Sequence, residues 1–226
     1  MNYIKNPKDI ETKSFEIIEE LIGERSLDPL QAPIIKRVIH TTADFEYLDQ
    51  LVFSNEAVEK AHAILKKGAV IVTDTSMALA GINKKALAKA GCQGVCFIGS
   101  EEVANLAKKN QTTRSATAVH YAFEQTEQPI IFVCGNAPTA LIELYELIQA
   151  GGRRPELIIG VPVGFVNVVE SKELILSTDV PHIIAKGRKG GSNVAAAICN
   201  ALLYQIVARE DESPLKDDIN QGSSQH

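Results

Sequence analysis

The stretch "PIIFVCGNAPTALIELYELIQAGG", residues 129–152, contains one complete strand–turn–helix unit and decides the fold. Its first half is a short apolar run that ends in a polar, glycine-containing turn, which is typical of a buried strand. Pro138 suits the first turn of the helix that follows, and the pair Gly151-Gly152 ends that helix. The apolar residues of the helix recur at the 3.6-residue period and form one face, made of Leu141, Leu144, Tyr145 and Ile148.

The same alternation of strand and helix recurs along most of the chain. Apolar runs that are typical of buried strands occupy residues 68–75, 94–100, 129–136, 156–165 and 181–188. Helical patterns follow them at residues 83–91, 101–110, 113–125, 138–152 and 192–208. This order favours a parallel sheet with helices on both faces. We therefore predict an α/β fold, a three-layer α/β/α arrangement around a mostly parallel sheet of roughly five strands, with an N-terminal helical segment.

The two ends of the chain differ from this pattern. Residues 1–66 are helical in pattern, with no strand of their own, and we expect them to pack on the sheet or to form a layer that faces a partner. Residues 1–208 are therefore predicted to form a single domain. The final stretch, residues 209–226, is polar and acidic, so we expect a disordered tail there.

The composition excludes several classes of partner. Hydrophobic residues make up 45% and charged residues 23% of the 226 residues, as in ordinary globular proteins. The net charge of −5 gives no overall field that would attract nucleic acid or an anionic membrane. No run approaches the roughly 18 apolar residues of a membrane helix, and residues 1–15 lack the apolar core of a signal peptide. We expect a cytoplasmic protein without nucleic-acid or membrane partners.

Polar turns follow four of the predicted strands. They are "TDTSMA", "GNAPT", "VPVGF" and "GRKGGSN". In an open parallel sheet, ligands bind outside the carboxyl ends of the strands. The four turns are therefore predicted to share one binding pocket.

The glycine-rich turn "KGRKGGSNVAAAICNALL", residues 186–203, has the ingredients of an anion site. Both common nucleotide fingerprints, G-x-G-x-x-G and G-x4-G-K-[ST], are absent from the chain. Gly190 and Gly191 permit close backbone approach, Ser192 or Asn193 can cap the next helix, and the first N–H groups of that helix attract anions. With Arg188 and Lys189 beside it, the turn suits carboxylates as well as phosphates. The alternative is an ordinary capped helix start.

His40, in "RVIHTTAD", is the histidine to which we assign a possible chemical role. A lone histidine at a helix end is more often structural, but proton transfer stays open because an imidazole titrates near pH ~6.5. No second histidine stands three or four residues away, and the four cysteines do not form two close pairs. The sequence therefore predicts no metal site.

Arg114 and Ser115 open a predicted helix within "NQTTRSATAVHYAF". An arginine at a helix N-terminus is unfavourable for the helix dipole. Its side chain is therefore either solvated or directed at a bound anion, and the residues alone leave both readings open.

Six stretches together resemble one known family, the precorrin-8X methylmutases, also called precorrin isomerases, and their cobalt-precorrin-8 counterparts. The stretches are "RVIHTTADF", "TDTSMALAGI", "TRSA", "GNAPTAL", "GVPVGFVNVVESKELI" and "GRKGGSNVAAAICNAL". The similarity runs in order from about residue 4 to residue 208. Asn83 lies where some members have another small polar residue.

The resemblance implies an isomerase of cobalamin biosynthesis. Such an enzyme moves a methyl group from C-11 to C-12 of a corrin-type ring, in a 1,5-sigmatropic shift that gives hydrogenobyrinate or cobyrinate. The resemblance implies no organic cofactor and no protein-bound metal, because any cobalt belongs to the substrate. It also implies a homodimer with the active site near the subunit contact, and it places the catalytic histidine at His40.

The resemblance further implies which residues contact the corrinoid substrate. They are Ser14, Arg37, Thr41, Asp74, Thr75, Asn83, Arg114, Ser115, Asn136, Ala137, Gly164, Phe165, Arg188, Gly190, Gly191, Ser192 and Asn193. The ring of such a substrate is flat and largely apolar, with carboxylates around its rim. It needs apolar walls and several separate cations, which Arg37, Arg114, Arg188 and Lys189 can supply.

Two other functions compete with this reading. A nucleotide- or sugar-phosphate-binding α/β protein would account for the glycine-rich turn, although the missing fingerprints argue against it. A non-catalytic tetrapyrrole carrier would share the pocket but would not need His40. We favour the isomerase, with His40 as the general acid.

Overall fold

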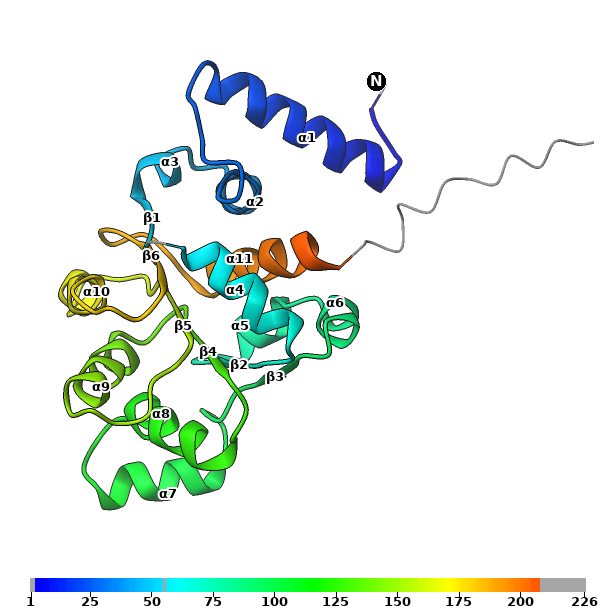
Figure 1. Cartoon of the computed structure of the whole chain (residues 1–226). Helices are drawn as coiled ribbons and strands as arrows, with labels where there is room; N and C mark the ends of the chain where they lie inside the picture. The colour runs from blue at the N-terminus through cyan, green and yellow to red at the C-terminus, as the bar shows by residue number, and fades with distance from the viewer. Residues whose placement is uncertain (1–2, 55, 208–226) are drawn as a thin grey trace, which may run out of the picture.

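The computed structural model describes residues 3–54 and 56–207. The predicted tail, residues 209–226, lies outside the described residues. The rest forms one α/β fold in which helices cover both faces of a single sheet (Figure 1). The three-layer arrangement that the alternation predicts is therefore confirmed.

The sheet has six strands in the order β1-β6-β5-β4-β2-β3. Strands β2 to β6 pair in parallel, and β1 pairs antiparallel with β6. The strands are β1 Leu51–Phe53, β2 Val70–Thr73, β3 Gln93–Val95, β4 Ile130–Cys134, β5 Leu157–Gly160 and β6 His182–Ala185.

Strand β1 corrects the expectation that residues 1–66 contain no strand. Leu51 pairs with Ala185 and Phe53 with Ile183 at the edge of the sheet. The strand is only three residues long, so it is too short to show the alternation by which strands are recognised. The sheet consequently has six strands where roughly five were expected.

Alternate residues of each strand face opposite layers, as the pleat requires. On β4, Ile131 and Val133 belong to one core, and Ile130 and Phe132 belong to the other. The first core lies under α1 Pro7–Ile22, α2 Ala32–Thr42, α4 Ala57–Lys66, α5 Ser76–Gly81, α6 Lys84–Lys89 and α11 Ser192–Ile206. The second lies under α8 Arg114–Gln125, α9 Pro138–Gln149 and α10 Val168–Leu176, with α7 Glu101–Lys109 packed on α8.

Helix α11 is the central helix of the first layer. It packs against α2, α4 and α5, and almost all of its side chains from Val194 to Leu203 are buried. A Cβ on Gly81 would lie 2.7 Å from the Cβ of Ala196, so the helices approach too closely there for a larger residue. Within residues 3–54 and 56–207, none of the helices has the length and apolarity to cross a membrane.

Helix α10 was not anticipated from the sequence. The stretch 156–165 was interpreted as a strand that runs into a glycine-containing turn, and β5 does end at Gly160 before the chain turns through Pro162 and Gly164. No helix was expected after that turn, where α10 begins at Val168. The buried face of α10 includes the polar residues Ser171 and Lys172. Buried polar positions break the apolar periodicity that identifies a helix.

Candidate active site

Strands β2, β4, β5 and β6 end at the same edge of the sheet, and we call the segments that follow them the carboxyl-end loops (residues 74–75, 135–137, 161–167 and 186–191). Strands β3 and β4 lie on opposite sides of β2, so the order of the sheet reverses between β2 and β4. Ligands of open α/β sheets bind at such a reversal. The four turns therefore do converge at one edge of the sheet, and the binding pocket that they are predicted to share stays a prediction.

Asp74 joins the first two of these loops. Its carboxylate accepts the backbone N–H groups of Gly135, Asn136 and Ala137 at 2.8, 2.7 and 2.7 Å. The side chain is 4% exposed. Burial raises the pKa of the Asp74 carboxyl, and the three N–H donors partly offset that rise. Asp74 therefore sets the shape of the β4–α9 turn, and its predicted contact with substrate stays a prediction.

The start of α11 packs on the same two loops. The hydroxyl groups of Thr75 and Ser192 are 2.8 Å apart. A Cβ on Gly135 would lie 2.8 Å from the Cα of Ser192, so only glycine permits this approach. Ser192 and Asn193 do not cap the helix as expected, because Gly191 is the N-cap residue and no side chain caps it. The Ser192 hydroxyl is engaged by Thr75 instead.

The glycine-rich loop, residues 186–191, is held by the loop that follows β5. The Gly191 N–H donates to the Val161 carbonyl at 2.8 Å, and the Gly164 N–H donates to the Arg188 carbonyl at 3.1 Å. Gly190 has a φ of +155°, and a Cβ there would overlap the Val161 carbonyl. The two glycines therefore serve close backbone approach, as the sequence predicts.

The four predicted cations are not equally available. Lys189 forms ion pairs with Asp44 at 2.6 Å and Glu46 at 2.9 Å. Its hydrogen bond lowers the pKa of Asp44, and the two carboxylates raise the pKa of Lys189. Arg37 pairs with Glu11 at 2.7 Å. Both cations are therefore engaged by carboxylates of the chain itself, and their contact with substrate stays a prediction.

Arg188 and Arg114 remain without a carboxylate partner in the described part of the chain. Arg188 is exposed, and its guanidinium lies 6.0 Å from the centre of the Phe165 ring. Arg114 is exposed at the first turn of α8. The hydroxyl of its neighbour Thr113 donates to the Thr139 hydroxyl at 3.2 Å, which ties this helix start to the first turn of α9.

Apolar side chains are exposed at the same edge of the sheet. Phe165 is 84% exposed and Val166 is 77% exposed. Val163, in the same loop, and Met77, in the first turn of α5, are also exposed. We call these four residues the edge patch. Together with the unpaired Arg188, it provides apolar and cationic groups side by side.

His40 lies in the last turn of α2, in the first layer. Its ring stacks on Phe15 of α1, with the ring centroids 5.1 Å apart and the planes at 19°. The guanidinium of Arg37 lies 4.8 Å from the centre of the same Phe15 ring. His40 is exposed, and its ring makes no hydrogen bond within residues 3–54 and 56–207. The ring is thus held by stacking while its two nitrogens remain available.

Two connections join His40 to the carboxyl-end loops. The ion pair of Asp44 with Lys189 ties the chain just after His40 to the glycine-rich loop. The Lys186 N–H also donates to the Gln50 carbonyl at 2.8 Å, which holds α3 Tyr47–Gln50 at the carboxyl end of β6. The chain that follows His40 is therefore tied to the edge where the other predicted residues gather.

The remaining predicted residues lie around this cluster or farther along α11. Ser14 precedes Phe15 and donates to the Ile10 carbonyl, and Thr41 donates to the Arg37 carbonyl. Asn83 caps α6 and donates to the hydroxyl of Tyr204 at 3.0 Å, near the end of α11. Asn136 and Asn193 are exposed and Ser115 is half-buried. Each of these contacts with substrate stays a prediction.

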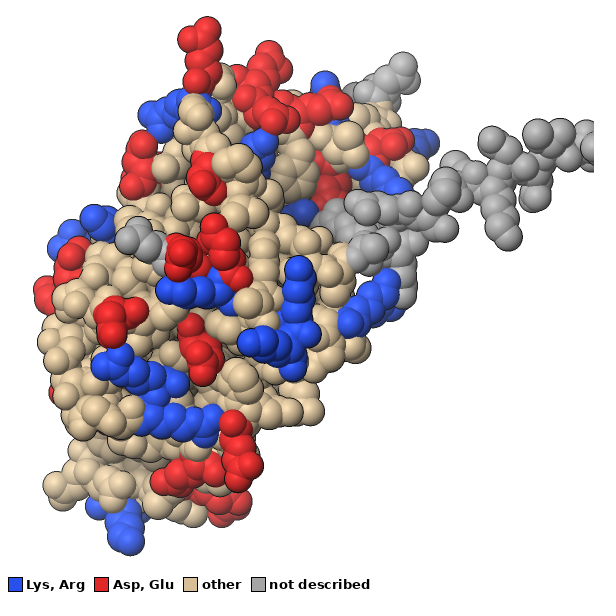
Figure 2. All heavy atoms as spheres, in the orientation of Figure 1, with Lys and Arg blue, Asp and Glu red and all other residues tan. Residues whose placement is uncertain are grey.

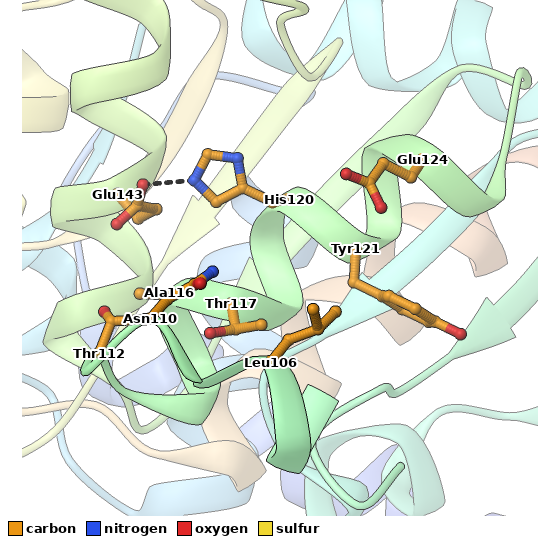
Figure 3. Close-up of a pocket in the computed structure, with 9 residues that line it drawn as sticks. All are labelled: Leu106, Asn110, Thr112, Ala116, Thr117, His120, Tyr121, Glu124 and Glu143. Atoms are coloured by element: carbon orange, nitrogen blue, oxygen red, sulfur yellow. Dashed lines mark hydrogen bonds and ion pairs between the residues drawn. The ribbon is translucent and has the colours of Figure 1, made fainter. Parts of the chain in front are cut away.

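A separate pocket of about 430 Å³ lies on the other face, along α8 (Figure 3). None of the predicted residues lines it, and its polar centre is His120, whose Nε2 lies 2.5 Å from Glu143 of α9. Helix packing makes this pair, so no spacing in the sequence could have shown it. Across the described residues, no three histidine, cysteine, aspartate or glutamate side chains gather closely enough to hold a metal ion.

Sequence reasoning also missed Lys172 of α10. Its ammonium is buried beneath the glycine-rich loop and donates to the carbonyls of Gly187 and Lys189. Burial lowers its pKa to about 8. Lys172 lies in one of the six stretches that carry the resemblance, but a lysine within the apolar run "VVESKELIL" is usually taken as the exposed side of a helix.

Known proteins resemble this chain over nearly its whole described length. The profile of the family described as precorrin-8X methylmutase matches residues 9–205. A cobalt-precorrin-8 methylmutase of Salmonella typhimurium is 48% identical, covering 91% of this chain and 99% of that protein. A precorrin-8X methylmutase of Pseudomonas aeruginosa is 39% identical, covering 89% and 97%. A crystal structure of precorrin-8x methyl mutase from Thermus thermophilus superposes with a TM-score of 0.81 at 40% identity, covering 88% and 96%.

Proposed function

The chain belongs to the precorrin-8X methylmutase family, and from this membership we propose that it moves a methyl group from C-11 to C-12 of a precorrin-8 ring. Methylmutases are isomerases of cobalamin biosynthesis, so the reaction exchanges no electrons with a second substrate. The product would be hydrogenobyrinate from the metal-free ring or cobyrinate from the cobalt-containing ring. The cobalt, where present, is part of the substrate.

His40 is the proposed general acid. Protonation of a ring nitrogen, or of the conjugated system attached to it, withdraws π density and eases departure of the methyl group from C-11. Proton transfer of this kind contributes about 10²–10⁴-fold to a rate. The observation that carries the assignment is the His40 ring itself, which is oriented by Phe15 and has no competing hydrogen bond in the described residues.

The carboxylates of the ring are the proposed partners of Arg188 and Arg114. Each guanidinium is exposed and without an ion pair in the part of the chain described, and arginine binds carboxylates with two parallel hydrogen bonds. The start of α11 supports the same role, because no side chain caps it and its first N–H groups attract anions. A chain with a negative net charge can bind a polyanion at these groups, because the electrostatic field at the site is set by the nearby cations and N–H groups. On the face drawn in Figure 2, cations and carboxylates are interspersed.

The edge patch is the proposed apolar wall of the site and part of a subunit contact. Phe165 and Val166 are exposed beside Arg188, and an apolar surface gains free energy when a ring or a second chain covers it. We propose a homodimer in which the partner chain meets this edge. No organic cofactor is required for the methyl shift.

Relatives of both substrate types are similar to this chain. The relatives at 48% and 44% identity are named for cobalt-precorrin-8, and one at 39% is named for precorrin-8X. The higher identity favours the cobalt-containing ring. Parallel assays with the two rings, followed by the change in the visible spectrum, test this preference, and faster conversion of the metal-free ring would reverse it.

The variant His40→Ala tests the function and the acid together. We expect turnover to fall by about 10²–10⁴-fold, while the corrinoid product still binds, because His40 is not one of the proposed carboxylate ligands. For the wild-type protein and for His40→Ala, turnover is followed by visible absorption and product affinity is measured by spectral titration. Conversion at the wild-type rate in His40→Ala would refute the acid role. Product binding without any conversion by the wild-type protein would instead indicate a tetrapyrrole carrier.

A further inference from the structure

Lys172 is a buried lysine that has no counter-charge in the described residues. It is 1% exposed, and no carboxylate pairs with it in the described part of the chain. Burying an ammonium without a counter-charge lowers the free energy of unfolding, even where backbone carbonyls accept its hydrogen bonds. A side chain that weakens the fold calls for another reason to be there.

The ammonium of Lys172 binds the backbone on both sides of Arg188. Its Nζ donates to the Gly187 carbonyl at 2.7 Å and to the Lys189 carbonyl at 2.9 Å. The two carbonyls flank the exposed Arg188 in the chain. One charged group therefore fixes the peptide units from which the Arg188 side chain extends.

The glycine-rich loop needs such an external anchor because its glycines allow its backbone many conformations. Gly187, Gly190 and Gly191 have φ values of +74°, +155° and +128°, and glycine has the largest conformational freedom to lose when a loop is ordered. The hydrogen bonds from the loop after β5 reach Arg188 and Gly191 only. Those of Lys172 are the ones that reach Gly187 and Lys189 from beneath.

We propose that Lys172 is a positioning residue for substrate binding, which holds residues 187–189 so that the Arg188 guanidinium meets a carboxylate of the corrin ring. This inference rests on the proposed function. Lys172 does not touch the substrate and moves no proton. It acts through the backbone of the glycine-rich loop.

The test compares Lys172→Met, which keeps the length of the side chain and removes its donors, with Ser171→Ala. Ser171 is a matched control, because it is the preceding residue of α10, is fully buried and donates to the Val168 carbonyl at 2.9 Å. Hydrogen exchange of the amides in residues 187–193 is measured without ligand. Affinity for the corrinoid product, KM and kcat are measured with both folded variants.

We expect Lys172→Met to speed exchange in residues 187–193 and to raise the product Kd and KM by about tenfold, since hydrogen bonds to charged groups are worth this much. The kcat should stay within about threefold, because His40 lies on another element. Ser171→Ala should match the wild-type protein in all four measurements. If Lys172→Met does not fold, Lys172→Gln, which keeps a neutral donor, should show smaller changes in the same direction.

Wild-type loop exchange and product affinity in a folded Lys172→Met variant would overturn the proposal. Equal effects of Ser171→Ala would overturn it as well, because they would show general loosening of α10. A wild-type protein that neither binds nor converts a corrinoid would refute the proposed function instead. The exchange measurement keeps the two failures apart, since it needs no ligand.

Discussion

At the scale of single residues, the site is organised by buried polar groups that hold backbone. Asp74 gathers three N–H groups of the β4–α9 turn, and Lys172 gathers two carbonyls of the glycine-rich loop. Neither role is visible in the sequence, because backbone partners leave no residue pattern. Thr75 and Arg188, by contrast, could be located from their place at the ends of the predicted strand stretches 68–75 and 181–188.

Asp74→Asn tests the first of these anchors. In the wild-type protein, both carboxylate oxygens of Asp74 accept hydrogen bonds from backbone N–H groups. In the variant, the NH₂ group of the asparagine amide replaces one of these oxygens and cannot accept those bonds. We expect a loss of about 2 kcal/mol in the free energy of unfolding, measured by urea denaturation, because hydrogen bonds to a buried charge are lost. Asp179→Asn is the control, since Asp179 pairs with Arg154 on the surface and should cost less than about 1 kcal/mol. Equal losses in the two variants would contradict the anchoring role of Asp74.

At the scale of elements, the periodicity of apolar residues identified the helices and strands that have one apolar face. It missed the elements that lack such a face. Helix α9 begins at Pro138 and ends before Gly151, as predicted. Helix α10 was missed because Ser171 and Lys172 lie on its buried face, and β1 was missed because three residues show no period. The packing of α11 on the β4–α9 turn also could not be predicted, because it depends on a contact between segments about 57 positions apart in the chain.

Gly135→Ala tests that packing. The added methyl group would meet the Cα of Ser192 at 2.8 Å, so α11 and the turn must separate. Overpacking of this kind costs about 1–3 kcal/mol of unfolding free energy, and displacement of the α11 start should also weaken corrinoid binding. Gly99→Ala is the control, because a Cβ there meets no atom within 4 Å. Thermal unfolding and spectral titration of the two variants provide the comparison, and an unchanged Gly135→Ala would show that the contact is looser than described.

At the scale of the whole molecule, the parallel sheet brings the four carboxyl-end loops to one edge, although they are far apart in the chain. The alternation of strand and helix was enough to predict the three layers and the gathering of the four turns. It was not enough to tell which cations are free, because the ion pairs of Lys189 with Asp44 and Glu46 join segments remote in sequence. The site of an isomerase therefore depends on fold-level contacts as well as on motif residues.

The proposed homodimer is tested at this scale. We expect light scattering to give twice the chain mass of 24.5 kDa, because association covers the apolar edge patch. Phe165→Ser should shift the protein towards the monomer, since burial of an aromatic side chain stabilises an interface by about 1.5–3 kcal/mol. Leu21→Ser is the matched control, because Leu21 is also exposed but lies on α1, away from the edge patch. Equal dissociation of both variants, or a monomeric wild-type protein, would argue against a contact at Phe165.

Helix α11 follows every other described element in chain order, yet it fills the first core and supplies one side of the site. During synthesis, the preceding helices and strands leave the ribosome before the helix that covers them. Until α11 emerges, the apolar faces of α2, α4 and β4 stay open to water and to chaperones. The binding surface is thus completed late in translation, and a prematurely terminated chain that lacks α11 should be recognised by quality control as incompletely folded.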